Sequence, residues 1–274
     1  MRTFTRRQFL IAAGVAAVSA TVPGTAGRRS WAARPARPPA SPAGYSFADE
    51  FDWPAGTPHT ARWRHDLGGG GWGNRELQTY TSSLANARQD GRGHLVITAI
   101  PGRDGTWTSA RLKTEGLFAQ AGGSWQARIK LDSRPGCWPA CWLLGADIGQ
   151  VGWPACGEID MMEDFGASYV QATVHTPAGA ATSMAYGGVA SDGEWHVYQL
   201  DWTAAGLAFF RDGACYLTAT AADFPAGSWL YGPGNGGCFL LLNLAVGGDG
   251  PGGPPPPSAR FPVRMLVDYV RVWA

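Results

Sequence analysis

Three carboxylic acids within six residues are the feature of this sequence that most clearly indicates chemistry. They are Glu158, Asp160 and Glu163, and their neighbours are apolar, namely Ile159, Met161, Met162 and Phe165. The nearest Lys or Arg residues along the chain are Arg134 and Arg211. A solvated acidic turn is the alternative interpretation, but charged residues in an apolar segment are kept mainly where they are paired or have a function. The segment therefore predicts a catalytic site.

The spacing of the three acids decides which chemistry they could do. On a regular strand Glu158 and Asp160 share a face, whereas Glu163 points the other way. One extra residue at Met161 and Met162, a β-bulge, returns Glu163 to that face. A retaining glycosidase uses two carboxyl groups about 5–5.5 Å apart. We therefore expect Glu158 to be the nucleophile and Glu163 the acid/base, with Asp160 hydrogen-bonded to Glu158 and helping to keep Glu163 protonated.

The acidic segment resembles the E-I-D-x-x-E signature of glycoside hydrolase family 16 in its bulged form. Other family motifs are matched in order within residues 45–274, at residues 71–81, 138–145, 173–175, 242–248 and 267–273. Two positions depart from the family pattern. Cys141 stands where an aromatic residue is usual, and Thr176, Pro177 and Ala178 replace Gly-Pro-Gly-Tyr after His175. The second departure concerns a loop expected beside the cleft.

The resemblance implies an all-β fold, a β-jelly-roll sandwich of two antiparallel sheets with an open concave cleft. It also implies the endo-β-1,3-glucanase (laminarinase) branch, which hydrolyses internal bonds of β-glucan polysaccharide with retention. Mixed-linkage β-1,3-1,4 cleavage is expected as a side activity. The protein is expected to need no catalytic cofactor and to be a monomer. Two alternatives stay open. A non-catalytic β-glucan-binding protein would have lost a catalytic carboxylate, and a glucan transglycosylase would use the same residues.

Five further residues are candidates for substrate binding. Trp138 and Trp142 are four apart and share a strand face, where core packing is the alternative to stacking on sugars. Asn74 suits a hydrogen bond to a sugar hydroxyl group. By itself His175 would more often be structural, and Arg111 could be a solvated surface residue. The resemblance places all five along the cleft.

The resemblance also implies a structural calcium ion away from the chemistry. Many family members bind calcium on the convex face through a late-strand Asp and early backbone carbonyl groups, which correspond here to Asp268, Glu50 and Gly93. Ligand sets made only of oxygen suit calcium. A charge at the rim of the sheet is the alternative interpretation of Asp268.

The charge distribution divides the chain near residue 44. Residues 1–44 hold seven Arg and no acidic residue, so the net charge of +1 becomes −6 without them. Residues 45–274 also hold 12 of the 13 Trp. This acidic, Trp-rich part disfavours nucleic-acid binding and suits a neutral sugar polymer.

The N-terminal segment has the pattern of an export leader. Arg6 and Arg7 precede a short apolar run over residues 11–18, which is too short to anchor the chain in a membrane. We expect a twin-arginine signal peptide over residues 1–26, a linker rich in Pro, Ala and Arg over 27–44, and a catalytic domain over 45–274. We therefore expect a bacterial, secreted protein that is not attached to a membrane after cleavage of the signal peptide.

Cysteines and turn residues complete the prediction of the fold. Five Cys leave at least one unpaired; Cys215 and Cys238 could pair, and Cys156 is expected to be inert. Short strands are predicted at 95–99, 125–131, 195–202 and 207–211, and 39 Gly and 20 Pro argue against long helices. Hairpins are predicted at the Asp-Gly pairs beginning at residues 104, 192 and 212. Two antiparallel sheets packed face to face are the expected result.

Overall fold

The computed structural model describes residues 44–167, 169–178, 181–234 and 236–274, without the side chains of 181–186. This part belongs to a compact unit that runs from Ser41 to Ala274. The predicted signal peptide and the predicted linker, apart from Gly44, lie outside the described residues. Within the described residues, no helix is long and apolar enough to cross a membrane.

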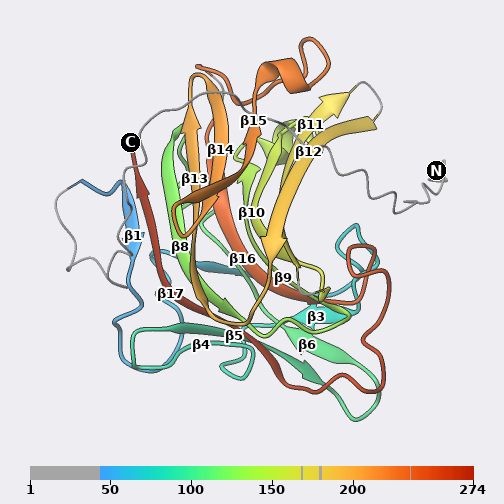
Figure 1. Cartoon of the computed structure of the whole chain (residues 1–274). Helices are drawn as coiled ribbons and strands as arrows, with labels where there is room; N and C mark the ends of the chain where they lie inside the picture. Colours follow the sequence, from blue (N-terminus) through green and yellow to red (C-terminus); the bar gives the residue numbers. More distant parts are fainter. Residues whose placement is uncertain (1–43, 168, 179–180, 235) are drawn as a thin grey trace. The chain divides into compact units, whose positions relative to one another are not determined.

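Two β-sheets form the described part of the chain (Figure 1). The ten-stranded sheet contains β1 (Phe47–Asp49), β3 (Gln78–Tyr80), β4 (Ala87–Gln89), β5 (Leu95–Pro101), β6 (Trp107–Ser109), β8 (Gly123–Leu131), β13 (Trp195–Thr203), β14 (Gly206–Arg211), β15 (Ala214–Ala219) and β17 (Val263–Trp273). The seven-stranded sheet contains β2 (Arg64–Asp66), β7 (Arg111–Lys113), β9 (Cys137–Gly145), β10 (Glu158–Asp164), β11 (Tyr169–Ala178), β12 (Ala181–Ala190) and β16 (Cys238–Val246). Helical turns are limited to α1 (Ile148–Val151) and the 3-10 turn η1 (Ala221–Asp223) among these residues. The predicted all-β, two-sheet fold is confirmed.

Alternating polarity explains how the sheets bury a shared core. Along β8, Trp125, Ala127, Ile129 and Leu131 are buried, and the residues between them are half-buried. Since successive strand side chains point to opposite faces, this pattern directs one face of the strand inward. Apolar residues of both sheets join in one buried cluster. Burial of this apolar surface, at roughly 25 cal/mol per Å², is the main force that holds the sheets together.

Two of the three predicted hairpins are confirmed. Asp212 and Gly213 join β14 to β15 with φ angles of 52° and 81°, as a tight two-residue turn requires. The loop with Gly105 joins β5 to β6, which pair antiparallel. The prediction at Gly193 is wrong, because this turn connects β12 in one sheet to β13 in the other. A further difference is that β3 and β6 pair in parallel.

The cysteine pairing predicted from the sequence is also wrong. Cys215 is exposed on β15 of the ten-stranded sheet, whereas Cys238 is buried on β16 of the seven-stranded sheet. All five cysteines are free. Burial raises the pKa of the Cys156 thiol to about 11, so this residue is an unreactive thiol, as expected.

Candidate active site

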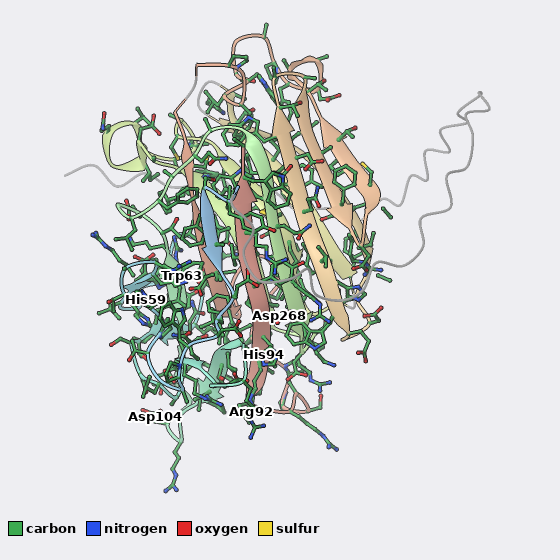
Figure 2. The ribbon with its side chains drawn as sticks, turned by 90° about the vertical axis from the view of Figure 1, so that its left-hand side faces the viewer. His59, Trp63, Arg92, His94, Asp104 and Asp268 are labelled. Carbon is green, nitrogen blue, oxygen red and sulfur yellow. The ribbon has the colours of Figure 1, made fainter. Side chains whose placement is uncertain are left out.

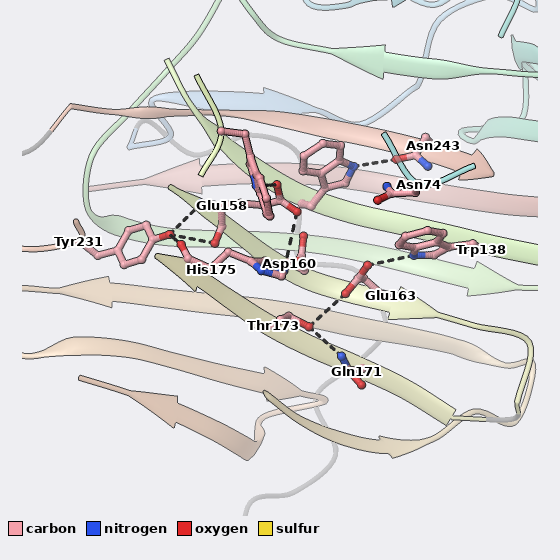
Figure 3. A network of polar contacts seen from close by, with 12 residues as sticks. Asn74, Trp138, Glu158, Asp160, Glu163, Gln171, Thr173, His175, Tyr231 and Asn243 are labelled. Carbon is pink, nitrogen blue, oxygen red and sulfur yellow. Dashed lines mark hydrogen bonds and ion pairs between the residues drawn. The ribbon is translucent and has the colours of Figure 1, made fainter. Parts of the chain in front are cut away.

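The central strand of the candidate site is β10, which carries the predicted bulge. Its pairing with β9 shifts register between Asp160 and Met162, and its pairing with β11 shifts between Asp160 and Glu163. Met161 and Met162 therefore both enter the core. Because the extra residue is absorbed there, Glu158, Asp160 and Glu163 lie on the outer face of the seven-stranded sheet (Figure 3). We call these three residues the carboxylate row.

The first member of the row, Glu158, is held by two aromatic side chains from loops. Trp153 is exposed and donates from Nε1 to Glu158 Oε2 at 2.7 Å. The buried Tyr231 hydroxyl accepts from the Glu158 backbone N–H at 2.8 Å and lies within hydrogen-bonding distance of the carbonyl oxygens of Glu158 and His175. A Cβ atom at Gly157 would lie 2.9 Å from that hydroxyl, so glycine permits the approach.

The middle member, Asp160, faces a histidine on the neighbouring strand. His175 is the direct partner of Glu158 in the β10–β11 ladder. Its Nε2 atom lies 3.1 Å from Asp160 Oδ2 and 3.9 Å from Glu158 Oε1. The structure thus places His175, which was expected along the cleft, beside Asp160 and Glu158.

The last member, Glu163, is buried and accepts two hydrogen bonds. Trp138 Nε1 donates to Glu163 Oε1 at 2.9 Å, and Thr173 Oγ1 lies 3.1 Å from Glu163 Oε2. Gln171 in turn donates to Thr173 at 2.9 Å (Figure 3). These contacts fix the position of the carboxyl group that we expect to act as the acid/base.

Burial and mutual repulsion raise the proton affinity of the whole row. Burial, followed by the charge of Asp160, raises the pKa of Glu158 to about 8. Burial raises the pKa of Asp160 to about 8 against the effect of its hydrogen bond with Glu158. Burial, followed by the charges of Asp160 and Glu158, raises the pKa of Glu163 well above its ordinary value. Burial and mutual repulsion therefore oppose the simultaneous ionisation of all three groups.

A second hydrogen-bonded chain runs beside the row. Trp142 donates to Asn243 at 2.7 Å, and Asn243 donates to the Tyr80 hydroxyl at 3.2 Å. Tyr80 contacts Glu76 at 3.3 Å, and Asn74 also donates to Glu76 at 3.3 Å. The chain links two predicted substrate-binding residues through Glu76, whose pKa is raised by burial.

Arg111 is neither solvated nor free in this arrangement. Its guanidinium carbon lies 5.0 Å from the ring centroid of Trp72 and 4.8 Å from that of Trp142. Its Nε atom lies 2.9 Å from Asp66 Oδ2. Half-buried Trp138 and the amides of Asn74 and Asn243 lie beside the carboxylate row (Figure 3), and Trp142 is paired with Asp160 in the β9–β10 ladder. Such groups suit the stacking and hydrogen bonding of sugar rings.

The predicted calcium site, formed by the Asp268 carboxylate and by backbone carbonyl groups at Glu50 and Gly93, stays a prediction. Asp268, on β17 (Figure 2), lies 2.8 Å from Arg128 Nη1. Both carboxylate oxygens of Glu50 accept hydrogen bonds from Arg271. A cation at Asp268 would compete with the Arg128 guanidinium group, whereas Arg271 occupies the side chain of Glu50 and not its backbone carbonyl group. A groove of about 660 Å³ beside β1 is lined by Glu50 but by none of the carboxylate row.

Several residues of the site were not predicted. Trp153, Tyr231, Thr173 and Asn243 contact the candidate residues from loops or other strands. Trp153 stands only five residues before Glu158, whereas Tyr231 carries no sequence signal. Thr176, Pro177 and Ala178, expected in a loop, continue β11 and pair with β12.

Comparisons with known proteins match most of the chain to one family. A family model described as "Glycosyl hydrolases family 16" matches residues 74–233. The chain is 36% identical over 242 residues to "Beta-glucanase" of Rhodothermus marinus, covering 83% of this chain and 84% of that protein. It is 32% identical over 259 residues to "Glucan endo-1,3-beta-glucosidase A1" of Niallia circulans, covering 83% of this chain but only 37% of that longer protein. The X-ray structure of the laminarinase from Rhodothermus marinus matches with a TM-score of 0.74 and 36% identity, over 84% of this chain and 96% of that one.

Proposed function

Because the chain belongs to glycosyl hydrolases family 16, we propose that it is a secreted, retaining endo-β-1,3-glucanase. Mixed-linkage β-1,3-1,4-glucan is its expected secondary substrate. The observation that carries the proposal is the row of Glu158, Asp160 and Glu163 on the outer face of β10. Similarity to proteins named as a β-glucanase and a laminarinase supports the substrate class.

The proposed reaction has two steps at one carbon atom. Ionised Glu158 attacks the anomeric carbon while Glu163 gives its proton to the leaving glycosidic oxygen. Glu163, now a carboxylate, then takes a proton from water, and this water displaces Glu158 from the same carbon. Two displacements restore the original configuration. The burial of Glu163 suits an acid that must hold a proton before attack, whereas the side chain of Glu158 is 19% exposed and can meet the sugar.

Substitution of each carboxylate tests the assignment of roles. Glu158→Gln and Glu163→Gln should each lower kcat for laminarin by roughly 10³-fold or more, with unchanged circular dichroism. Azide should restore turnover to Glu158→Ala and yield an inverted glycosyl azide, because a small anion can fill the space of the lost nucleophile. Near-normal turnover in either Gln variant would rule out this assignment.

The anomeric configuration of the first product tests the mechanism independently. Proton NMR in the first minutes of laminarin hydrolysis should show the β-anomer first, with the α-anomer arising only by mutarotation. Initial α-anomer would exclude Glu158 as nucleophile. Products longer than the substrate would favour a transglycosylase. Binding of laminarin without any bond cleavage would favour a glucan-binding protein.

Secretion is a separate part of the proposal and rests on the sequence of residues 1–26. Arg6 and Arg7 before a short apolar run support export by the twin-arginine route. Replacing both arginines with lysine should leave the protein inside the cell. N-terminal sequencing of the exported wild type should then locate the cleavage site.

A further inference from the structure

Part of the carboxylate row also has the geometry of a transition-metal site. One oxygen of Glu158, one oxygen of Asp160 and a ring nitrogen of His175 all lie within 4.8 Å of one another. We propose that these three atoms bind a zinc ion and that zinc so bound excludes the glucan chain. The site would hold an inhibitory ion, since the nucleophile itself is one of its ligands.

Two of the three distances between the donor atoms are close to those around zinc. Zinc takes nitrogen and oxygen ligands at about 2.0–2.1 Å, and tetrahedral geometry then sets neighbouring ligands about 3.3–3.4 Å apart. His175 Nε2 lies 3.1 Å from Asp160 Oδ2 and 3.9 Å from Glu158 Oε1. These two distances lie on either side of the tetrahedral value. Small rotations of the side chains therefore suffice to coordinate an ion.

The three donors can be freed for an ion, which would replace the proton in the hydrogen bond between Asp160 and Glu158. Trp153 binds Oε2 of Glu158, which leaves Oε1 directed at His175. The side chain of Asp160 is 4% exposed, and its Oδ2 atom has no hydrogen-bond partner other than the approach of His175. His175 Nδ1 has no hydrogen-bond partner either. No donor at Nδ1 therefore forces the ring proton onto Nε2. The ring can therefore turn the lone pair of Nε2 toward an ion.

Charge and ligand type favour zinc over the hard cations. Among the described residues, His175 is the only base that forms an ion pair with the carboxylate row, and Arg111 acts on Glu158 from farther away, so a divalent cation would offset repulsion within the row. Imidazole suits zinc, whereas calcium and magnesium prefer ligand sets made only of oxygen. Glu158 and His175 are 19% and 15% exposed, which leaves the fourth coordination position open to water.

Calorimetric titration of the full, folded chain with zinc chloride, without glucan, tests the site. One zinc ion should bind, and magnesium chloride and calcium chloride should give no matching signal. His175→Gln should weaken zinc binding at least tenfold, and so should Asp160→Asn, which keeps the shape of the side chain. Thermal melts establish that both variants are folded. Zinc binding of wild-type strength in both variants would overturn the proposal.

Two matched controls separate this site from other zinc-binding groups. His196 also contacts two carboxylates, but Asp212 lies at its Nδ1 and Asp192 at its Nε2, on opposite sides of the ring. His196→Gln should therefore leave zinc binding unchanged. Cys215→Ser should do so too, since it removes only the exposed thiol. Loss of zinc binding in either control would contradict the proposed ligands.

Kinetics then test whether zinc and glucan exclude each other. At zinc concentrations ten times the dissociation constant, the apparent KM for laminarin should rise about elevenfold with unchanged kcat. A lower kcat at unchanged KM would contradict a shared site. The calorimetric test does not depend on the proposed glucanase function, so the failure of laminarin as substrate would leave it standing.

Discussion

At the scale of single residues, the burial that raises the pKa of the carboxylate row also makes ionisation of the row destabilise the fold. Glu163 is buried, and its pKa is raised well above 4.5 by burial and then by the charges of Asp160 and Glu158. Its folded state therefore binds a proton more tightly than the unfolded chain does. The resulting contribution to stability is complete below about pH 4.5 and is lost as the pH rises toward the folded pKa.

This linkage gives a prediction for Glu163→Gln, which replaces an ionisable group with a neutral one of the same size. The melting temperature of the variant should match that of the wild type near pH 4.5 and exceed it by several degrees at pH 8. Glu194→Gln, at an exposed position, is the control and should show no such trend. Calorimetric melts between pH 4.5 and 8 measure both. A difference in melting temperature that stays constant across that pH range would show that ionisation of Glu163 does not destabilise the fold.

At the scale of elements, the bulge in β10 decides which side chains reach the outer face. It directs both Met161 and Met162 into the core, and the Met161 carbonyl oxygen accepts a hydrogen bond from Tyr216 of the opposite sheet at 3.0 Å. That bond satisfies a backbone group that the irregular ladder leaves unpaired. The bulge is thus supported from across the core.

Deletion of single residues in β10 tests this function of the bulge. Without Met161 the register to β9 and β11 becomes regular, and Glu158, Asp160 and Glu163 still share a face. The variant should retain activity within about tenfold but lose about 2–5 kcal/mol of stability with the buried side chain. Deletion of Ile159 is the matched control, because it puts Glu158 and Asp160 on opposite faces and should abolish activity. Equal activities of the two deletion variants would refute the inference that the register of β10 decides which side chains reach the outer face.

At the scale of the whole molecule, the first and last strands of the described part lie side by side. In the ten-stranded sheet β1 pairs with β17, with Phe47 opposite Val272 (Figure 1). Next to this pair, Glu50 binds the guanidinium group of Arg271, whose side chain is 1% exposed. The beginning of the domain thus neutralises a charge buried near its end.

Two shortened chains test where the stable unit begins. A chain starting at Gly44 keeps β1 and should match the full chain in melting temperature and in kcat/KM for laminarin. A chain starting at Phe51 lacks β1 and Glu50, which leaves the Arg271 charge buried without its partner. It should lose about 3–5 kcal/mol of stability. Equal denaturant midpoints for the two shortened chains would mean that β1 and the Glu50–Arg271 pair add nothing.

The sequence by itself determined the carboxylate row, its bulge and the two-sheet fold. These follow from the period of two along a strand and from local turn residues, which act over a few positions. Tertiary structure alone decided that Tyr231 supports Glu158, that Glu76 links Asn74 to Tyr80, and that Cys215 and Cys238 lie in different sheets. Tertiary structure also decided that Asp268 pairs with Arg128 and that Glu50 pairs with Arg271. These contacts depend on which distant strands and loops meet, and strand periodicity carries no information about that.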